Sequence, residues 1–413
     1  MLKPRRSFKG LTADKRFQDN PLISNLRTFE ESLIADGYAA VTVRPNLSLL
    51  ADFGQWLTRS GFSVTDLDER LVEAFVNDKR RVQRGSSETL KQFLDHLRKR
   101  DVVPVPEPVC DRSPLAEILN QYEKHLRLER GLVTATIVNY RPVVDKFLVE
   151  RFKAGTFLLR ELRSSDISAF VLRHAHTMSP RRAQLMTTAL RSFLRFLFQN
   201  GELETDLCAS VPTVADWRLS TIPKYLTPEE VERVLWACDR RTSTGRRDYA
   251  ILLLLARLGL RAGEVVTLQL DDIDWRVGEI IVRGKGLFHD RMPLPSDVGE
   301  ALTSYLRLDR PPACRTRRVF VCMKAPRRGF AGPSTVTTIV RRALGRADLH
   351  PAFKGAHLLR HSLATAMLRS GATMSEIGEV LRHRLASTAE IYAKVDFDGL
   401  RSLAHPWPLG GGQ

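Results

Sequence analysis

The sequence predicts a mainly α-helical protein with a small antiparallel β-sheet in its last part. Apolar residues recur at helical spacing along most of the chain, as at Leu190, Phe193, Leu194 and Leu197. Alternation and turn residues typical of strands gather in one stretch, DDIDWRVGEIIVRGKGLFHDRMPLP, residues 271–295. Two proline-containing breaks divide the 413 residues into three segments, in agreement with the two or three domains expected for this length.

An excess of basic residues is the strongest signal in the composition. The formal net charge of +17 and the pI near 10.0 favour a polyanionic partner, with nucleic acid as the first candidate. A membrane surface is the competing partner, but it would require the charge to gather on one amphipathic helix, and here the charge is spread along the chain. No stretch approaches the roughly 18 apolar residues of a spanning helix, and the N-terminus lacks the apolar run of a signal peptide. We therefore expect a soluble, cytoplasmic protein associated with the nucleoid.

The cysteines argue against a disulfide framework and a structural zinc site. They are scattered and contain no C-x-x-C pair: Cys110, Cys208, Cys238, Cys314 and Cys322. We expect small buried or incidental thiols, and no metal ion.

The two breaks set the expected domain boundaries. They are VVPVPEPVCDRSP, Val102–Pro114, and ASVPTVADWRLSTIPKYL, Ala209–Leu226. We expect an N-terminal helical domain over residues 1–108, a second helical domain over 112–212, and a third domain with a C-terminal tail over 224–413.

The first two segments resemble each other and predict a tandem repeat of about a hundred residues. PLISNLRTFEESLIADGYAAVTV from Pro21 aligns with PLAEILNQYEKHLRLERGLVTATI from Pro114. Further on, DERLVEAFV corresponds to SSDISAFV, and LKQFLDHL, Leu90–Leu97, corresponds to LRSFLRFL, Leu190–Leu197. Each copy is expected to be a small helical bundle.

The second copy also carries candidate DNA-binding residues. Its segment SPRRAQLMTTALRSFLRF sets four arginines around an apolar stripe: Arg181, Arg182, Arg191 and Arg195. A solvated outer face of a helix explains the same pattern, so the DNA contact is one of two interpretations.

The third segment shows clear signals for its local elements. In LTPEEVERVLWAC, Thr227 and Glu230 have the spacing of a capping box and Pro228 suits the first helical position. The apolar run YAILLLLARLGL predicts a buried helix that ends near Gly259, and hairpin turns are expected at Gly278 and at residues 284–286. Helices resume after the sheet, and capping-box spacing recurs twice near the end, at Thr373 with Glu376 and at Ser387 with Glu390.

A cluster of cationic and imidazole side chains in GAHLLRHSLATAM predicts an anion site. His357 and His361 stand four residues apart, a spacing that can hold zinc on a helix. However, Leu358 replaces the glutamate base of a zinc protease, and Arg360 would place a permanent cation beside the metal. An arginine fork pairs with two phosphate oxygens at once, so a phosphate is the better ligand.

Further residues in the third segment complete this set. GLRAGE supplies Arg261 and Glu264, the GKG turn supplies Lys285, and VLRHRLASTAEIYAKV supplies His383 and then Tyr392. In this order the segment from Thr227 to Val395 resembles the catalytic domain of the tyrosine recombinases, the phage-integrase and Xer-like family. The second segment resembles the SAM-like core DNA-binding domain of that family, and the first segment is an additional copy of it.

The resemblance implies a role for each matching residue. Arg261 and Arg360 would clamp the phosphate, Lys285 would be the hairpin lysine, His357 and His383 the two motif histidines, and Tyr392 the nucleophile. Many members have glycine where this chain has Arg382, so Arg382 would either add a phosphate contact or face the solvent.

The chemistry requires these residue types independently of the family. Fixed cations meet the charge that grows on the non-bridging oxygens of a phosphodiester, and a phenol with a pKa near 10 needs a base and positive potential. His357 is the predicted base and Lys285 the predicted acid for the departing 5′ oxygen. His383 would hydrogen-bond the phosphate, Glu264 would orient an arginine or the helix, and His361 would be a packing or supporting residue.

These observations predict a site-specific DNA recombinase that works through a 3′-phosphotyrosine and needs no cofactor; no ATP-binding motif is present. The extra N-terminal repeat favours a mobile element as its source. The family resemblance further implies a homo-tetramer on double-stranded DNA, formed alone or with related recombinases, and a C-terminal tail that is passed to the next protomer.

Three alternatives remain open at this level. A type IB topoisomerase-like enzyme shares the chemistry, and an accessory protein would bind DNA with an inactive site. A metal-dependent nuclease would use Asp271, Asp272 and Asp274, although their spacing is more typical of a turn and the start of a strand.

Overall fold

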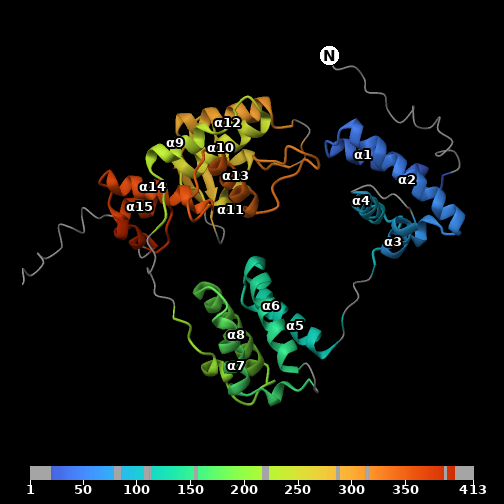
Figure 1. Ribbon diagram of the computed structural model, residues 1–413, viewed down its shortest axis with the longest axis horizontal. Coiled ribbons are helices and arrows are strands. Elements are labelled where there is room, and N and C mark those ends of the chain that lie inside the picture. The colour runs from blue at the N-terminus through green and yellow to red at the C-terminus, as the bar shows by residue number, and fades with distance from the viewer. Residues whose placement is uncertain are drawn as a thin grey trace, which may run out of the picture. The chain divides into compact units, whose positions relative to one another are not determined.

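The computed structural model describes residues 20–78, 85–106, 111, 113–152, 157–215, 223–284, 289–311, 314, 316–385 and 388–395. These residues are mostly helical, and the strands among them form one three-stranded antiparallel sheet, as the sequence predicted (Figure 1). Residues 106–221 form one compact unit, and residues 1–105 and 222–413 group into the other.

The N-terminal part is a small helical bundle around its own apolar core. Its elements are α1 (Ile23–Ala35), α2 (Ala40–Ser60), the 3-10 turn η2 (Val64–Asp66), α3 (Glu69–Asp78) and α4 (Ser86–Arg98). Phe29, Phe53 and Phe93 are among the largest fully buried side chains of this core.

The unit of residues 106–221 repeats the same order of helices (Figure 1). It adds a π-helical turn after its first helix and a 3-10 turn after its last helix. The elements are α5 (Pro114–Lys124), η3 (His125–Glu129), α6 (Thr134–Phe152), η4 (Leu159–Glu161), α7 (Ser164–Ala175), α8 (Pro180–Gln199) and η5 (Leu207–Ser210). The corresponding positions Leu90–Leu97 in α4 and Leu190–Leu197 in α8 bury the same pattern of apolar residues. The aligned sequences therefore build matching helices.

The last part of the chain combines helices with the sheet. Its elements are α9 (Pro228–Trp236), α10 (Ser243–Arg257), α11 (Ala262–Thr267), η6 (Leu270–Asp272), β1 (Ile273–Asp274), β2 (Glu279–Arg283), β3 (His289–Pro293), α12 (Ser296–Leu308), α13 (Pro333–Arg346), α14 (His357–Arg369), α15 (Met374–Val380) and the 3-10 segment η8 (Glu390–Val395).

Local signals account for the boundaries of several of these elements. The Thr227 side chain accepts from the backbone N–H of Glu230, and the Glu230 carboxylate accepts from the N–H of Thr227, which is the predicted capping box. The box of Thr373 and Glu376 is also present. The Ser387 side of the third predicted box lies outside the described residues.

The sheet follows the predicted hairpin. Its order is β1-β2-β3, with Ile280 opposite Met292, and the first turn closes at Gly278, whose φ of 71° suits glycine. The second turn, at residues 285–288, lies outside the described part of the chain.

Two separate apolar clusters hold this last part together. The larger cluster is centred on α10, where residues 250–256 are all buried. The smaller one, here called the C-terminal cluster, consists of Ala364, Ile377, Leu381, Ala389 and Tyr392. It joins η8 to α14 and α15.

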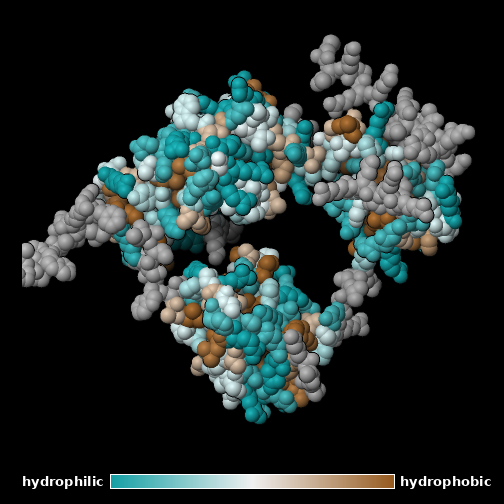
Figure 2. Space-filling view, in the orientation of Figure 1, coloured by the Kyte–Doolittle hydropathy of each residue, from teal (hydrophilic) through white to brown (hydrophobic). Residues whose placement is uncertain are grey.

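No helix in the described part of the chain is long and apolar enough to cross a membrane. Figure 2 shows a largely hydrophilic face on which apolar side chains form small, separate patches.

Candidate active site

Four elements of the last part bring most of the predicted site residues together. Arg261 directly precedes α11, Arg360 and the two histidines lie on the first turns of α14, His383 follows α15, and Tyr392 lies on η8. Hydrogen bonds and ring contacts connect these elements. Lys285 lies outside the described residues.

Arg360 is buried and links α14 by hydrogen bonds to the segments that follow α10 and α15. Its side chain is 3% exposed, and its guanidinium donates to the carbonyl oxygens of Gly259 and Leu381. Burial, followed by the neighbouring cations Arg261 and Arg382, lowers its pKa to about 10. This value still leaves Arg360 positively charged at neutral pH.

Arg261 is the more accessible of the two predicted clamp arginines, with a side chain that is 39% exposed. Its Nη1 donates to Oε1 of Glu264 at 2.7 Å, and its backbone N–H donates to Oε2 at 2.8 Å. Glu264 therefore both caps α11 and orients Arg261. Burial raises the pKa of this carboxyl, but Arg382 and Arg261 outweigh it, so the pKa lies below its usual range.

Arg382 differs from both sequence expectations, because it neither faces the solvent nor is free for a phosphate contact. Its side chain is 7% exposed, and its Nη2 donates to Oε2 of Glu264 at 2.9 Å. Its backbone carbonyl accepts from Nη2 of Arg261 at 3.3 Å. Arg382 thus closes a ring of contacts with Glu264 and Arg261.

The two histidines of α14 occupy different environments. His357 is exposed, yet desolvation by the surrounding protein, Arg360 and Arg261 hold its pKa below the usual range. His361 is half-buried, and burial, His357 and Arg360 lower its pKa to about 4, so its ring is neutral at neutral pH. The ring centroids are 6.2 Å apart.

His361 is the histidine that contacts the predicted nucleophile. Its Nδ1 is 2.9 Å from Oη of Tyr392, within hydrogen-bond distance, although His357 was the predicted base. The sequence contained a signal for this contact: a residue four positions after His357 lies on the same helix face, one turn further on. The spacing alone predicts only a packing or supporting role for His361, because it does not indicate the position of Tyr392.

Tyr392 is shielded from solvent in this structure. The side chain is 1% exposed and belongs to the C-terminal cluster. Burial raises its pKa above the usual range, in opposition to Arg360 and Arg261, which lower it. The phenol is therefore protonated at neutral pH.

His383 also lies beside Tyr392. Its ring is parallel to that of Tyr392, with 6.3 Å between centroids and 4° between planes. Burial, Arg360 and Arg261 lower its pKa to about 4. Its Nδ1 is buried without a hydrogen-bond partner among the described residues, so the ring retains an unused polar atom.

The aspartates of the nuclease alternative form a turn and the start of a strand, as the spacing favoured. Asp272 is buried and accepts from Arg283 at 2.6 Å, and Asp271 pairs with Arg317. The described residues contain no group of three or more metal-ligating side chains. The carboxylates thus neutralise arginines around the sheet.

The arginines of α8 divide into two groups. Arg181, Arg182 and Arg195 are exposed, in agreement with either sequence interpretation. Arg191 differs, since its half-buried guanidinium donates to the carbonyls of Val211 and Pro212 at 2.9 and 3.2 Å. These hydrogen bonds hold the segment after η5 against α8.

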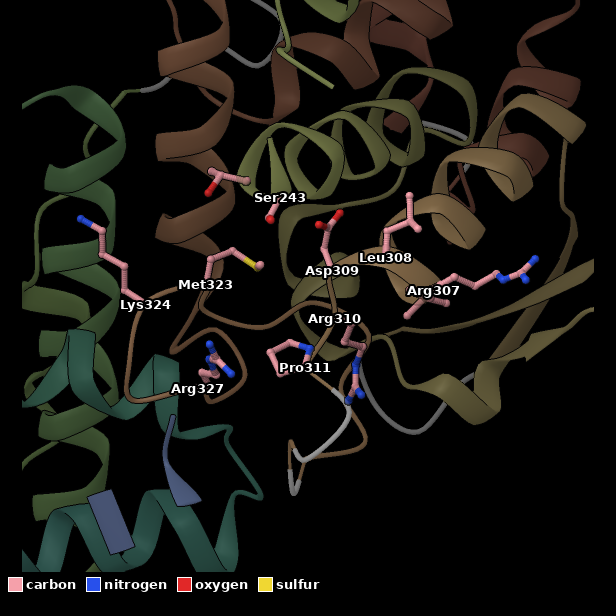
Figure 3. Close-up of a pocket in the computed structure, with 11 residues that line it drawn as sticks. Ser243, Arg307, Leu308, Asp309, Arg310, Pro311, Met323, Lys324 and Arg327 are labelled. Atoms are coloured by element: carbon pink, nitrogen blue, oxygen red, sulfur yellow. The ribbon is translucent and has the colours of Figure 1, made fainter. Parts of the chain in front are cut away.

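A separate pocket of about 690 Å³ lies between the start of α10 and the segment after α12 (Figure 3). None of the predicted site residues lines it. Arg310 in this pocket donates to the carbonyls of Thr316 and Arg318, and Asp309 is paired with Arg246. These contacts support the loops around the pocket.

Comparison with known proteins finds family matches in two parts of the chain. Residues 224–398 match the phage integrase family, and residues 119–201 match the SAM-like N-terminal domain of phage integrases.

Similar sequences cover most of the chain. The integrase/recombinase y4rA of Sinorhizobium fredii is 46% identical over 397 residues, which cover 94% of this chain and 95% of that protein. The tyrosine recombinase XerC of Shewanella amazonensis is 30% identical over 300 residues, 70% of this chain and 96% of that protein.

Among solved structures, the XerH site-specific recombinase in a post-cleavage complex with a palindromic difH substrate has a similar fold. It has a TM-score of 0.57 and 19% identity, and the alignment covers 81% of this chain and 93% of that chain.

Proposed function

The chain belongs to the phage integrase family of tyrosine recombinases, and on this premise we propose that it is a site-specific recombinase that serves a mobile element. It is an enzyme that cuts and rejoins DNA strands.

The observation that carries the residue assignment is the convergence of cations and imidazoles on one tyrosine. Arg261 and Arg360 influence the pKa of Tyr392 directly, and His383 lies parallel to its ring. Two arginines beside a phenol provide the fixed positive charge that a phosphodiester needs in the transition state. No carboxylate group in the described residues offers a comparable site for a metal ion.

In the proposed reaction, Oη of Tyr392 bonds to the phosphorus and the bond to the 5′ oxygen breaks, which leaves a 3′-phosphotyrosine and a free 5′ hydroxyl. The phenolic proton would pass to His357 and the 5′ oxygen would take a proton from Lys285, so the protons and charges balance. Arg261 and Arg360 would hold the non-bridging oxygens. His357 would act as the base, His383 would hydrogen-bond the phosphate, and Lys285 would protonate the 5′ oxygen.

The same intermediate would also serve a type IB topoisomerase, and the unit of residues 106–221 favours the recombinase. This unit matches the SAM-like domain of phage integrases. Its exposed arginines Arg181, Arg182 and Arg195 are suitable for phosphate contacts. The three-domain division, with boundaries at 1–108, 112–212 and 224–413, belongs to this proposal and is supported by the separate apolar clusters.

We further propose that four copies assemble on double-stranded DNA, as cutting and exchange of two duplexes requires four active sites in total. The predicted exchange of a C-terminal segment involves Leu400, Leu403 and Trp407, which lie outside the described residues. Sedimentation of the full chain on its target DNA measures the assembly directly.

The cleavage assignment is tested with a nicked DNA substrate that traps the covalent intermediate. We expect a protein–DNA adduct that survives denaturant and still forms in excess EDTA, since the proposed chemistry uses no metal ion. Tyr392→Phe should bind the same DNA and form no adduct. Undiminished adduct in this variant, or adduct formation that depends on Mg²⁺, would contradict the assignment.

The phosphate clamp is tested in the same assay. Arg261→Ala should slow adduct formation on the order of a hundredfold, by analogy with the loss of one oxyanion donor. Arg276→Ala, at an exposed position of the β1-β2 turn, is the matched control and should retain the normal rate.

A further inference from the structure

We propose that His361 is a positioning residue that holds Tyr392 in a shielded position between cleavage events, through the hydrogen bond between Nδ1 and Oη. This inference rests on the proposed role of Tyr392 as the nucleophile. It assigns to His361 a role that is distinct from clamping the phosphate.

The geometry of the pair supports this role. The two atoms are 2.9 Å apart, and they belong to residues 31 positions apart in the sequence. The tyrosine side chain is 1% exposed, so a DNA phosphate has no path to its hydroxyl in this arrangement. Attack on DNA therefore requires Tyr392 to move, and this movement breaks the bond to His361.

The surroundings of Tyr392 make such a movement feasible. Tyr392 lies on η8, a short 3-10 segment, and the small C-terminal cluster that holds it is separate from the main core. A short segment over a small apolar cluster opens at a lower free-energy cost than an element of the main core. The hydrogen bond to His361 adds a specific, directional contact to this weak packing.

The protonation states favour a holding role over that of a base. The neutral imidazole of His361, whose pKa is about 4, faces a phenol whose pKa is raised by burial. A base this weak is poorly matched to the removal of a phenolic proton. It is well suited to a neutral hydrogen bond that keeps the phenol protonated and unreactive.

The test measures how readily Tyr392 reacts in the DNA-free, full-length protein. Tetranitromethane nitrates exposed phenols, and mass spectrometry of peptides gives the nitration rate of each tyrosine. Tyr305, fully buried in the main core, is the internal reference. The quantity of interest is the rate of Tyr392 divided by the rate of Tyr305.

Two substitutions separate the hydrogen bond from the shape of the side chain. His361→Phe keeps a planar ring and removes the hydrogen bond, so the rate ratio should rise about fivefold, the equivalent of one neutral hydrogen bond. His361→Asn supplies an acceptor oxygen near the position of Nδ1 and should keep the ratio close to that of the unmodified protein.

Each other outcome overturns the proposal. An unchanged ratio in His361→Phe, whether both rates stay the same or both rise together, would show that the hydrogen bond does not specifically hold Tyr392. A ratio in His361→Asn as high as in His361→Phe would show that an acceptor at this position is not sufficient.

The nicked-substrate assay then separates this inference from the proposed function. His361→Phe should form the adduct at least as fast as the unmodified protein, and loss of the adduct in both variants would make His361 the base and overturn the holding role. If the unmodified protein forms no adduct through Tyr392, the proposed function fails, while the nitration ratio still decides whether His361 shields the tyrosine.

Discussion

At the scale of single residues, Arg382 shows how a site accommodates an unusual side chain. Its φ of 54° lies in the left-handed region, where a non-glycine residue costs about 1 kcal/mol or more. In return, the buried guanidinium neutralises Glu264 and donates to the carbonyls of Leu258 and Val380. The strain is thus offset by charge-assisted contacts that no glycine could make.

We predict that Arg382→Gly lowers the thermal stability of the protein although it relieves the backbone strain. The buried Glu264 carboxylate would lose one of its two guanidinium partners, at a cost of roughly 1–3 kcal/mol. A calorimetric scan should show a lower Tm, by about 2–4 °C for each kcal/mol.

The Glu264→Gln exchange provides the control for this prediction. Because the glutamine side chain carries no charge, adding Arg382→Gly to this variant should cost less than the same change in the unmodified protein. Equal losses of stability in the two backgrounds would show that Arg382 acts through contacts other than the one with Glu264.

At the scale of elements, the end of α10 determines the position of Arg360. Gly259 follows α10 with a φ of 57°, and its carbonyl accepts from the Arg360 guanidinium. A Cβ atom here would lie 2.6 Å from Cδ2 of Leu381 and 3.1 Å from Cδ2 of Leu363. The positive φ at this helix end favours glycine, and a Cβ atom would require the side chain of Leu381 to shift.

We predict that Gly259→Ala impairs cleavage more than its backbone penalty alone explains. The new methyl group would push against the buried side chain of Leu381, a residue whose backbone carbonyl accepts from Arg360. We expect a loss of at least about tenfold in the rate of adduct formation, since small displacements of catalytic groups have large effects.

Gly278→Ala is the matched control, because Gly278 also has a positive φ, 71°, and no atom lies within 4 Å of the position that its Cβ would take. This variant carries the same type of backbone penalty without a clash. Comparable cleavage rates in the two variants would exclude a steric effect at Gly259.

At the scale of the whole molecule, the net charge of +17 favours binding to the phosphates of DNA. Much of this charge near the candidate site is internally paired, as with Arg382 and Glu264 or Arg283 and Asp272. The exposed arginines of α8 have greater freedom to contact phosphates. Binding is thus expected to release counterions and to weaken steeply with salt.

We predict that log K for the target DNA falls linearly with log salt concentration, and that Arg181→Ala combined with Arg182→Ala reduces the slope by about 2. Fluorescence anisotropy at several salt concentrations measures this slope. Arg160→Ala, an exposed change on η4 of the same unit, is the control and should affect the slope less. A flat salt profile would contradict a role for these arginines in phosphate binding.

The sequence by itself determined the features that depend on neighbouring residues. Helical class, the capping boxes at Thr227 and Thr373 and the hairpin at Gly278 were predictable, because propensities and local hydrogen bonds act within a few residues. The family was also predictable from the order and chemistry of Arg261, Arg360 and the other motif residues. Only a few residue types can bind a phosphodiester and catalyse its transfer.

Only the tertiary structure determined which of these side chains are in contact. Tyr392 and His361 are 31 positions apart, and Glu264 and Arg382 are 118 positions apart, so their contacts depend on how α11, α14, α15 and η8 pack. The sequence alone did not indicate that His361 contacts Tyr392 or that Arg382 pairs with Glu264, because spacing along one helix or loop carries no information on the opposing element. Burial of Tyr392 beside His361 follows from the packing of the C-terminal cluster, and with it the inference that this histidine holds the nucleophile.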